Sequence, residues 1–314
     1  MLIDSHLHIK PHMHPDELVR YMDNLNIDQA WLLSWEEDRP AIPEFYKPLS
    51  INHILEAHKQ YPNRFVPFYA ADPSREDIDK VFKETLKDPI KGCGELKVTL
   101  NWDSPKILSY LEKINERGLP LIFHMEKPNS FYLPESASFL DKALAKLLNG
   151  GFNGLAKKYI QKWIQSTGIL KNKIQINSRH FPGYMLNFHS LESALYQYPN
   201  IHFIGHGPHF WNHISWHQKP YLTHQKGKIK KEGITCQLLR KYPNMYADLS
   251  GVSAFNALKR DQKFTKPFLE EHHQKLLFGT DNYDLGQQNL IEHMNLPDYK
   301  TNDICWKNAQ KLIH

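Results

Sequence analysis

Cysteine is scarce in this chain of 314 residues, and its few copies stand far apart. They are Cys93, Cys236 and Cys305, and none belongs to a Cys-x-x-Cys pair. An odd number of cysteines at wide spacing predicts neither a disulfide framework nor a zinc site built from thiolates. We therefore expect small buried side chains in a reducing compartment.

Long apolar runs are missing as well. Runs such as residues 276–278 fall far short of the ~20 residues that a membrane-spanning helix needs. The opening residues, MLIDSHLHIK, lack the basic stretch and the long apolar stretch of a secretory leader. These absences predict a cytoplasmic protein that does not act on a membrane. Internal repeats and low-complexity segments are also absent.

Charge of one sign does not dominate the chain, which carries 39 Lys and Arg against 34 Asp and Glu. The one notable basic cluster is KGKIKK at residues 226–231. No stacked aromatic or recognition-helix pattern accompanies it, so it predicts a solvated loop and not nucleic-acid binding. The net charge of +5 is compatible with a small, acidic substrate. Assembly into a homo-oligomer stays open.

What the sequence does contain is an alternation of short β-rich segments with segments of helical spacing. This alternation predicts βαβ units around a parallel sheet. Eight strands are expected, at residues 2–8, 29–35, 65–71, 92–98, 120–125, 201–207, 245–251 and 275–281. Eight such units predict an α/β fold of the (β/α)8 TIM-barrel type, which we expect to fill residues 1–314 as a single domain.

Helix signals support the units. Helices are expected at residues 15–25, at 75–86 with Ser74 as the N-cap, at 105–118 ending in Gly118, and at 301–313. Two connections are too long to be simple crossovers, and they predict long insertions after strands 5 and 6. They span residues 126–200 and 208–244, and loops at that end of a barrel usually cover the active site.

Histidine, in contrast to cysteine, is abundant at 19 residues. Asp4, His6 and His8 lie two residues apart, so an extended strand directs them to one face. Further candidates close other strands: His124 the fifth, His206 the sixth and Asp281 the eighth. Barrel enzymes keep their active sites at this rim.

Imidazole and carboxylate ligands suit zinc and similar divalent ions. A lone His-x-His motif is weak evidence for a metal site. A second such pair, His12 and His14, predicts only a solvated loop. Candidates at four separate strand ends are a stronger signal, because histidines of the core have no reason to gather at one edge. The sequence therefore predicts a site for a divalent cation, with zinc the expected ion.

These motifs resemble the amidohydrolase superfamily, in particular its amidohydrolase-related branch. The resemblance rests on the Asp4-x-His6-x-His8 motif, His124, His206 in IGHG and Asp281 in GTD. It implies that His6, His8, His124 and Asp281 are metal ligands. It also implies that His206 is either a second-metal ligand or an acid that donates a hydrogen bond to the substrate.

The fourth strand leaves the number of metals open. Glu95 and Lys97 lie two apart and share a face. Gly-Glu in this strand resembles the binuclear TatD-like hydrolases, where a carboxylate bridges two metals, whereas one metal is usual in the amidohydrolase-related branch. A third interpretation is a buried Glu95–Lys97 ion pair that orients the site.

The predicted reaction is hydrolysis of a carbonyl or phosphoryl group in a small, anionic substrate. A divalent cation would lower the pKa of a bound water toward ~7, Asp281 would accept its proton, and His206 would polarise the substrate. Asp4 would orient a ligand histidine or serve as a structural hydrogen-bonding residue. Two alternatives remain: a metal-dependent non-oxidative decarboxylase on the same scaffold, and a barrel that binds without catalysis.

Substrate contacts are the least defined prediction. Lys97, Arg179 and Asp248 are the candidates for substrate binding, and Trp211 and His213 in the second long connection are weaker ones. For Asp248, contact with the substrate or the His206 ring and a purely structural role are equally open. Aromatic residues of a long loop more often pack that loop against the protein.

Overall fold

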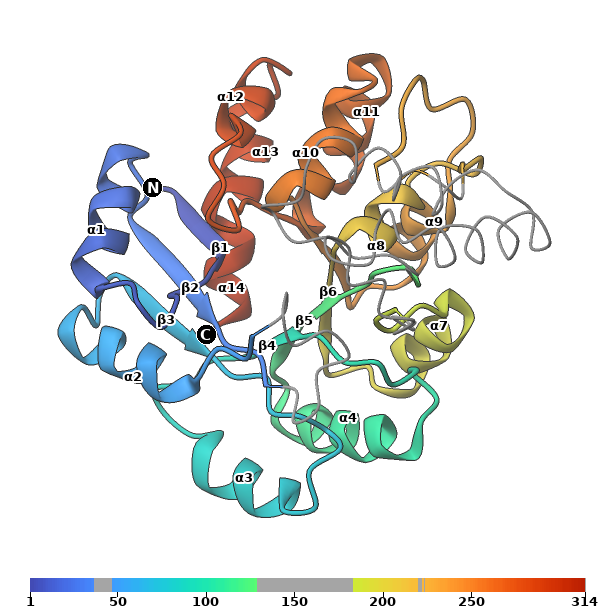
Figure 1. Cartoon of the computed structure of the whole chain (residues 1–314). Helices are drawn as coiled ribbons and strands as arrows, with labels where there is room; N and C mark the ends of the chain where they lie inside the picture. The colour runs from blue at the N-terminus through green and yellow to red at the C-terminus, as the bar shows by residue number, and fades with distance from the viewer. Residues whose placement is uncertain (37–46, 129–182, 220–221, 223, 314) are drawn as a thin grey trace, which may run out of the picture.

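The computed structural model describes residues 1–36, 47–128, 183–219, 222 and 224–313. In these ranges, eight parallel strands occupy the middle of the molecule and helices surround them (Figure 1). The strands are β1 (Ile3–Leu7), β2 (Gln29–Leu33), β3 (Phe65–Phe68), β4 (Cys93–Leu96), β5 (Pro120–His124), β6 (His202–His206), β7 (Met245–Asp248) and β8 (Leu276–Leu277). Each lies within a segment predicted from the sequence and is shorter than predicted.

The strands form two sheets in chain order, β1-β2-β3 and β4-β5-β6-β7-β8. Backbone contacts join them at both seams. A parallel bridge pairs Phe68 with Gly92 between β3 and β4. At the other seam the Ser5 amide donates to the Phe278 carbonyl at 2.9 Å, and the Asp281 amide donates to the His6 carbonyl at 2.8 Å. The predicted (β/α)8 barrel is therefore confirmed.

The outer layer follows the predicted order of helices. It comprises α1 (Pro15–Asn24), α2 (Ile51–Gln60), α3 (Ile78–Thr85), α4 (Pro105–Arg117), α7 (Phe188–Gln197), α8 (Pro208–Asn212), α9 (Ile234–Lys241), α10 (Gly251–Lys259), α11 (Gln262–His272), α12 (Gln287–Glu292), α13 (Asp298–Asn302) and α14 (Asn308–Leu312). A π-helical turn, Asp303–Lys307, joins α13 to α14. None of the helices in the described ranges has the length and apolar character needed to cross a bilayer.

Local sequence explains where these helices begin and end. Pro105 opens α4, and Gly118, at φ 62°, ends it in the left-handed conformation that glycine adopts without a Cβ clash. The Ser74 cap is a wrong prediction. The Ser74 amide donates to the Asp72 carboxylate at 2.7 Å, which makes a turn, and α3 starts later, after Asp77.

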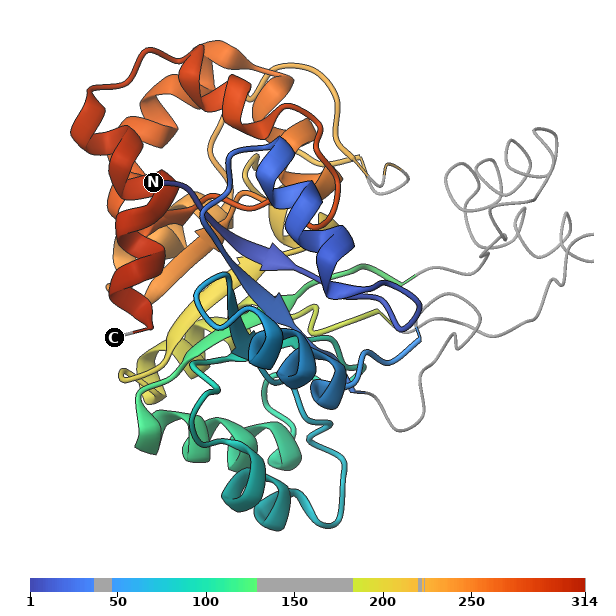
Figure 2. The same ribbon diagram turned by 90° about the vertical axis from the view of Figure 1, so that its left-hand side faces the viewer.

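An apolar floor fills the inside of the barrel. Seven of the strands contribute to it, through Ile3, Trp31, Phe68, Ile122, Ile204, Tyr246 and Leu277. Ala309 and Leu312 of α14 pack against this floor and close the amino-terminal end of the barrel. Both chain termini lie on that side of the molecule (Figure 2). Each buried side chain of this size contributes ~1.5–3 kcal/mol, so the floor is a rigid base for the residues above it.

The long connections differ in how much is described. The connection after β6 holds α8 and α9, as its predicted length allows. In the connection after β5, residues 129–182 lie outside the described residues, while α7 completes its last part.

Candidate metal centre

Strand alternation places three of the predicted residues directly above the apolar floor. His124, His206 and Asp248 each lie two positions beyond a floor residue of the same strand, namely Ile122, Ile204 and Tyr246. Side chains two apart share a face, so all three point into the barrel at its carboxyl-terminal end. They are buried, with 7%, 3% and 0% of their surface exposed.

Two further ligand candidates, His6 and Glu95, come from strands with an irregular register. The β1–β2 pairing shifts between Asp4 and Leu7, and the β4–β5 pairing shifts between Cys93 and Leu96. Such irregularities re-aim side chains and are common beside active sites. Here they lie at the residues that carry His6 and Glu95, which both point to the centre.

The carboxyl end of β8 is held by a clamp that sequence reasoning missed. The Asn282 side chain accepts from the His8 amide at 2.8 Å and donates to the His8 carbonyl at 2.9 Å. Asp281 and Asn282 have φ values of 55° and 60°, a left-handed region that Asp and Asn tolerate better than most residues. Their adjacency after a strand was the only sequence signal for this turn.

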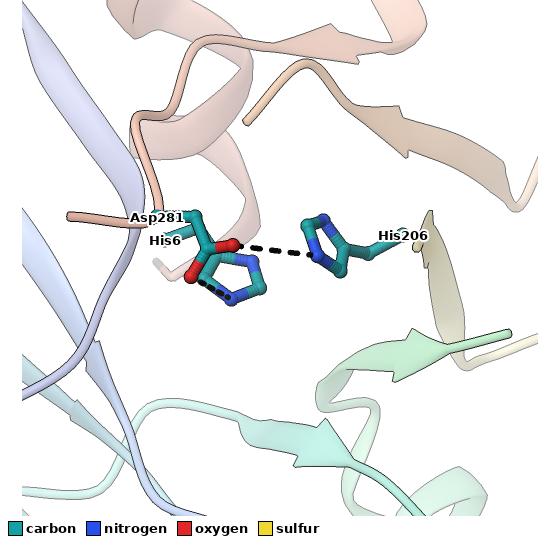
Figure 3. Close-up of side chains that lie close together, drawn as sticks. All are labelled: His6, His206 and Asp281. Carbon is teal, nitrogen blue, oxygen red and sulfur yellow. Dashed lines mark ion pairs between the residues drawn. The ribbon is translucent and has the colours of Figure 1, made fainter. Parts of the chain in front are cut away.

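Five side chains converge in two groups around Glu95. The β1–β8 group consists of His6, His8 and Asp281. The His6 and His8 Nε2 atoms lie 3.1 Å apart, and Asp281 Oδ1 lies 3.8 and 3.6 Å from them. Figure 3 shows the Asp281 carboxylate with one oxygen directed to His6 and the other to His206.

The β5–β6 group consists of His124 and His206. Glu95 Oε1 lies 2.6 Å from His124 Nδ1 and 3.9 Å from His206 Nε2. The other oxygen, Oε2, faces the first group at 3.4 Å from His8 Nε2 and 3.9 Å from His6 Nε2. One carboxylate therefore presents one oxygen to each group.

Hydrogen bonds at the Nδ1 atoms of His6 and His8 show whether their Nε2 atoms can bind a cation. His8 Nδ1 lies 2.9 Å from the Leu33 carbonyl, which can only accept, so His8 carries its proton there. His6 Nδ1 faces the Asp248 carboxylate at 2.5 Å and donates likewise. The two Nε2 lone pairs then face each other at 3.1 Å, where they repel unless a cation or a proton lies between them.

The spacing and chemistry of the site also suit a metal. Tetrahedral coordination with bonds of ~2.1 Å places ligand atoms ~3.4 Å apart, close to the 3.1–3.9 Å separations around the β1–β8 group. Overlapping sets within the described residues could each hold an ion: His6, His206 and Asp281; His6, His8 and Glu95; and Glu95, His124 and His206. Imidazole and carboxylate ligands together favour zinc and its neighbours.

Electrostatics keep the carboxylates charged in this buried place. Burial opposes ionisation of Glu95, but the charges of Lys97 and His124 hold its pKa well below the usual range. Burial likewise opposes ionisation of Asp248, and the charges and hydrogen bonds of His6 and His206 lower its pKa. Burial alone would lower the pKa of His206, but Asp248 above all raises it to about 9.

Asp4 lies deeper than the other candidates, as expected, but in the described ranges its carboxylate forms no hydrogen bond with an imidazole ring. Its carboxylate accepts from the His6 amide at 3.0 Å, from the Thr280 amide at 3.1 Å and from the Thr280 hydroxyl at 2.6 Å. Burial raises its pKa to about 7 despite these bonds. Of the two predicted roles, the geometry fits the structural one.

Lys97 lies beside Glu95. Its ammonium is 3.9 Å from Glu95 Oε2 and 4.4 Å from the centre of the Trp35 ring, with 7% of the residue exposed. Trp35 also packs edge-on against His8. This geometry fits the predicted ion pair; substrate binding by Lys97 stays a proposal.

The other predicted substrate contacts have mixed outcomes. Arg179 lies outside the described residues. Asp248 is fully buried, so a direct substrate contact does not fit, whereas the predicted contact with the His206 ring is present at 3.1 Å. Trp211 is buried and donates to the Asp248 carbonyl at 3.0 Å, and His213 packs on Phe188. Both therefore pack the connection after β6 against the barrel.

No protein-family model matches the chain, and no curated protein matches its sequence. Solved structures are similar to it in fold. A zinc-bound amidohydrolase from Burkholderia multivorans matches with a TM-score of 0.55 and 11% identity, covering 100% of this chain and 99% of that one. A TIM-barrel protein from Bordetella bronchiseptica matches at 0.54 and 14%, covering 95% and 81%. The 2,6-dihydroxybenzoate decarboxylase from Rhizobium matches at 0.52 and 13%, covering 99% and 98%.

The chain therefore has the fold of amidohydrolase-related TIM-barrel proteins over almost its whole length. At identities this low, the structural similarity shows a shared fold and does not show a shared reaction. Since one scaffold serves both an amidohydrolase and a decarboxylase, the reaction has to be argued from the side chains of the site.

Proposed function

We propose that this protein is a metal-dependent hydrolase acting on a small molecule. The observation that carries the proposal is the pair of His6 and His8 Nε2 lone pairs at 3.1 Å, with the Glu95 and Asp281 carboxylates beside them. Such an arrangement is costly to bury unless a cation completes it. A buried scaffold without catalysis would not need an accessible carboxylate there, and Asp281 is 26% exposed.

Two cation positions fit the residues best. His6, His8, Asp281 and Glu95 Oε2 would hold the first cation, and His124, His206 and Glu95 Oε1 the second. Zinc is the proposed ion, because the ligands are imidazoles and carboxylates. Lys97, beside Glu95, would offset excess negative charge at the bridge.

When bound, a divalent cation supplies Lewis acidity: it polarises a carbonyl or phosphoryl oxygen and lowers the pKa of water. The side chains perform the remaining steps. Asp281 lies nearest the open end and contacts both groups, so its carboxylate would accept the proton of the attacking water. The protonated Asp281 would then return the proton to the leaving group. With one cation only, a protonated His206 would be available to polarise the substrate instead.

Decarboxylation is the second candidate, because the Rhizobium decarboxylase shares the fold and Lys97 could anchor a carboxylate near the centre. A substrate panel would decide between them. Lactones, amides and phosphoesters would be compared with aromatic carboxylates in water labelled with ¹⁸O. Hydrolysis predicts ¹⁸O in the product, whereas release of carbon dioxide without ¹⁸O would refute it. Zinc binding without turnover of any substrate would favour a non-catalytic barrel.

A further inference from the structure

Two imidazoles of the centre share a single carboxylate oxygen on the side away from Glu95. The His6 and His206 rings lie 4.3 Å apart, centre to centre, and are tilted by 40°. Asp248 Oδ2 is 2.5 Å from His6 Nδ1 and 3.1 Å from His206 Nδ1. Glu95 faces the opposite nitrogen of each ring, with 3.9 Å to either Nε2. The rings are thus bracketed by two buried carboxylates.

This bracket determines which nitrogen of each ring carries a proton. A carboxylate only accepts hydrogen bonds. The Ser250 hydroxyl, 3.2 Å from His206 Nδ1, donates its own proton to Asp248, so it too accepts from that ring. Both Nδ1 atoms are therefore donors, and both Nε2 atoms of the neutral rings have free lone pairs. Each Nε2 then faces one of the two proposed cation positions. Since His6 belongs to the β1–β8 group and His206 to the β5–β6 group, one carboxylate acts on both.

The structure also holds Asp248 itself in place. The Ser250 hydroxyl donates to Oδ2 at 2.7 Å, and the Ser250 amide donates to Oδ1 at 2.8 Å. The Trp211 indole donates to the Asp248 carbonyl at 3.0 Å. Both oxygens are therefore committed, and rotation of the carboxylate would break several bonds inside a fully buried site.

We infer that Asp248 is a positioning residue that fixes His6 and His206 in the Nδ1–H form and thereby strengthens cation binding at both positions. The inference rests on the proposed two-position centre. It extends that proposal, because Asp248 contacts neither cation position and acts only through the two rings.

Asp4 provides a matched control for this inference. It is also a fully buried carboxylate next to His6, but it binds the His6 amide and Thr280 and touches no ring nitrogen. Asp4→Asn tests what loss of a buried carboxylate does to the site in general. Asp248→Asn tests the ring contacts, because the amide carries no charge and its NH2 group would face a donor, either the ring nitrogens or the Ser250 amide.

The experiment titrates Zn²⁺ into the chelator-stripped full-length protein and its variants by calorimetry. Asp248→Asn is expected to weaken both positions by about 10- to 100-fold, as outer partners of ligand histidines do elsewhere, while Asp4→Asn keeps both affinities. Weakening at one position only, no weakening, or equal weakening in Asp4→Asn would each overturn the inference.

A second measurement covers the case in which Asp248→Asn does not fold. Nitrogen-15 NMR of the imidazoles in the wild-type protein should show protonated Nδ1 in both His6 and His206. A proton on Nε2 of either ring in the zinc-loaded protein would overturn the inference. A wild-type protein that binds zinc with these tautomers but hydrolyses nothing would refute the proposed function and leave the role of Asp248 intact.

Discussion

The β1–β8 and β5–β6 groups reach the same centre by different means. In the β1–β8 group, residues from opposite ends of the sequence are joined by a side-chain clamp, since Asn282 binds the His8 backbone. In the β5–β6 group the strand pairing itself brings the ligands together, because His124 lies directly opposite His206 in the β5–β6 register.

The two groups also differ in the number of candidate ligands. The first offers three besides Glu95, and the second offers two. A cation with more protein ligands is held more tightly, so we expect the first position to fill first and the second to be lost first to a chelator. If the β5–β6 position is the weaker one, few changes of sequence in that group would decide whether such a barrel holds one metal or two.

The largest effect is expected from removing the imidazoles of the β1–β8 group. The double variant His6→Asn, His8→Asn should abolish metal binding at the β1–β8 position, because Asp281 and Glu95 Oε2 lose their nitrogen partners there. The floor residues are untouched, so circular dichroism should still report a folded barrel. Elemental analysis measures the metal, and full occupancy in this variant would defeat the ligand assignment.

Glu95→Gln tests the bridge between the groups. An amide cannot bring one charged oxygen to each position, so we expect metal content to fall by half, with the β1–β8 position retained. Elemental analysis of dialysed protein gives the ratio directly. A ratio of metal to protein equal to that of the wild type would indicate a centre with one metal. The proposal that both groups bind a cation would then be wrong.

Asn282→Ala breaks the clamp of the β1–β8 group. Loss of two hydrogen bonds and of a residue suited to positive φ should cost about 2 kcal/mol in the free energy of unfolding, measured with urea. Asn26→Ala is the control, because Asn26 has a similar φ of 55° but lies in the turn after α1. The clamp would lose its assigned role if both variants lost equal stability and equal zinc affinity.

Gly251→Ala should have the smallest effect. Gly251 has a φ of 70°, and a Cβ there would lie 2.9 Å from Asp281 Oδ2. Backbone strain of about 1–2 kcal/mol and displacement of Asp281 should lower turnover more than zinc content. Gly227→Ala shares the strain, at a φ of 82°, and no atom of the described residues lies within 4 Å of its Cβ. Equal turnover in the two variants would show that contact with Asp281 is unimportant.

The sequence was sufficient for the barrel and for the identity of most groups in the centre. Period-two spacing brought His6 and His8 to one face, and strand ends placed His124, His206 and Asp281 on one rim. Strand alternation could not show that one Asp248 oxygen serves two rings, because that depends on the relative depth of β1, β6 and β7. The Asn282 clamp depends on a turn conformation that the sequence does not specify. The predicted Ser74 cap is wrong because the Ser74 amide binds the Asp72 side chain in a turn before the helix.

The clamp at the barrel seam has a kinetic consequence. His8 and Asn282 are separated by 274 positions in the chain, so their two hydrogen bonds form only after almost the whole polypeptide has been ordered. Contacts of such long range form slowly, because the chain loses the entropy of closing a large loop before the contacts contribute any stabilising free energy. Refolding should therefore restore the helical signal before zinc affinity.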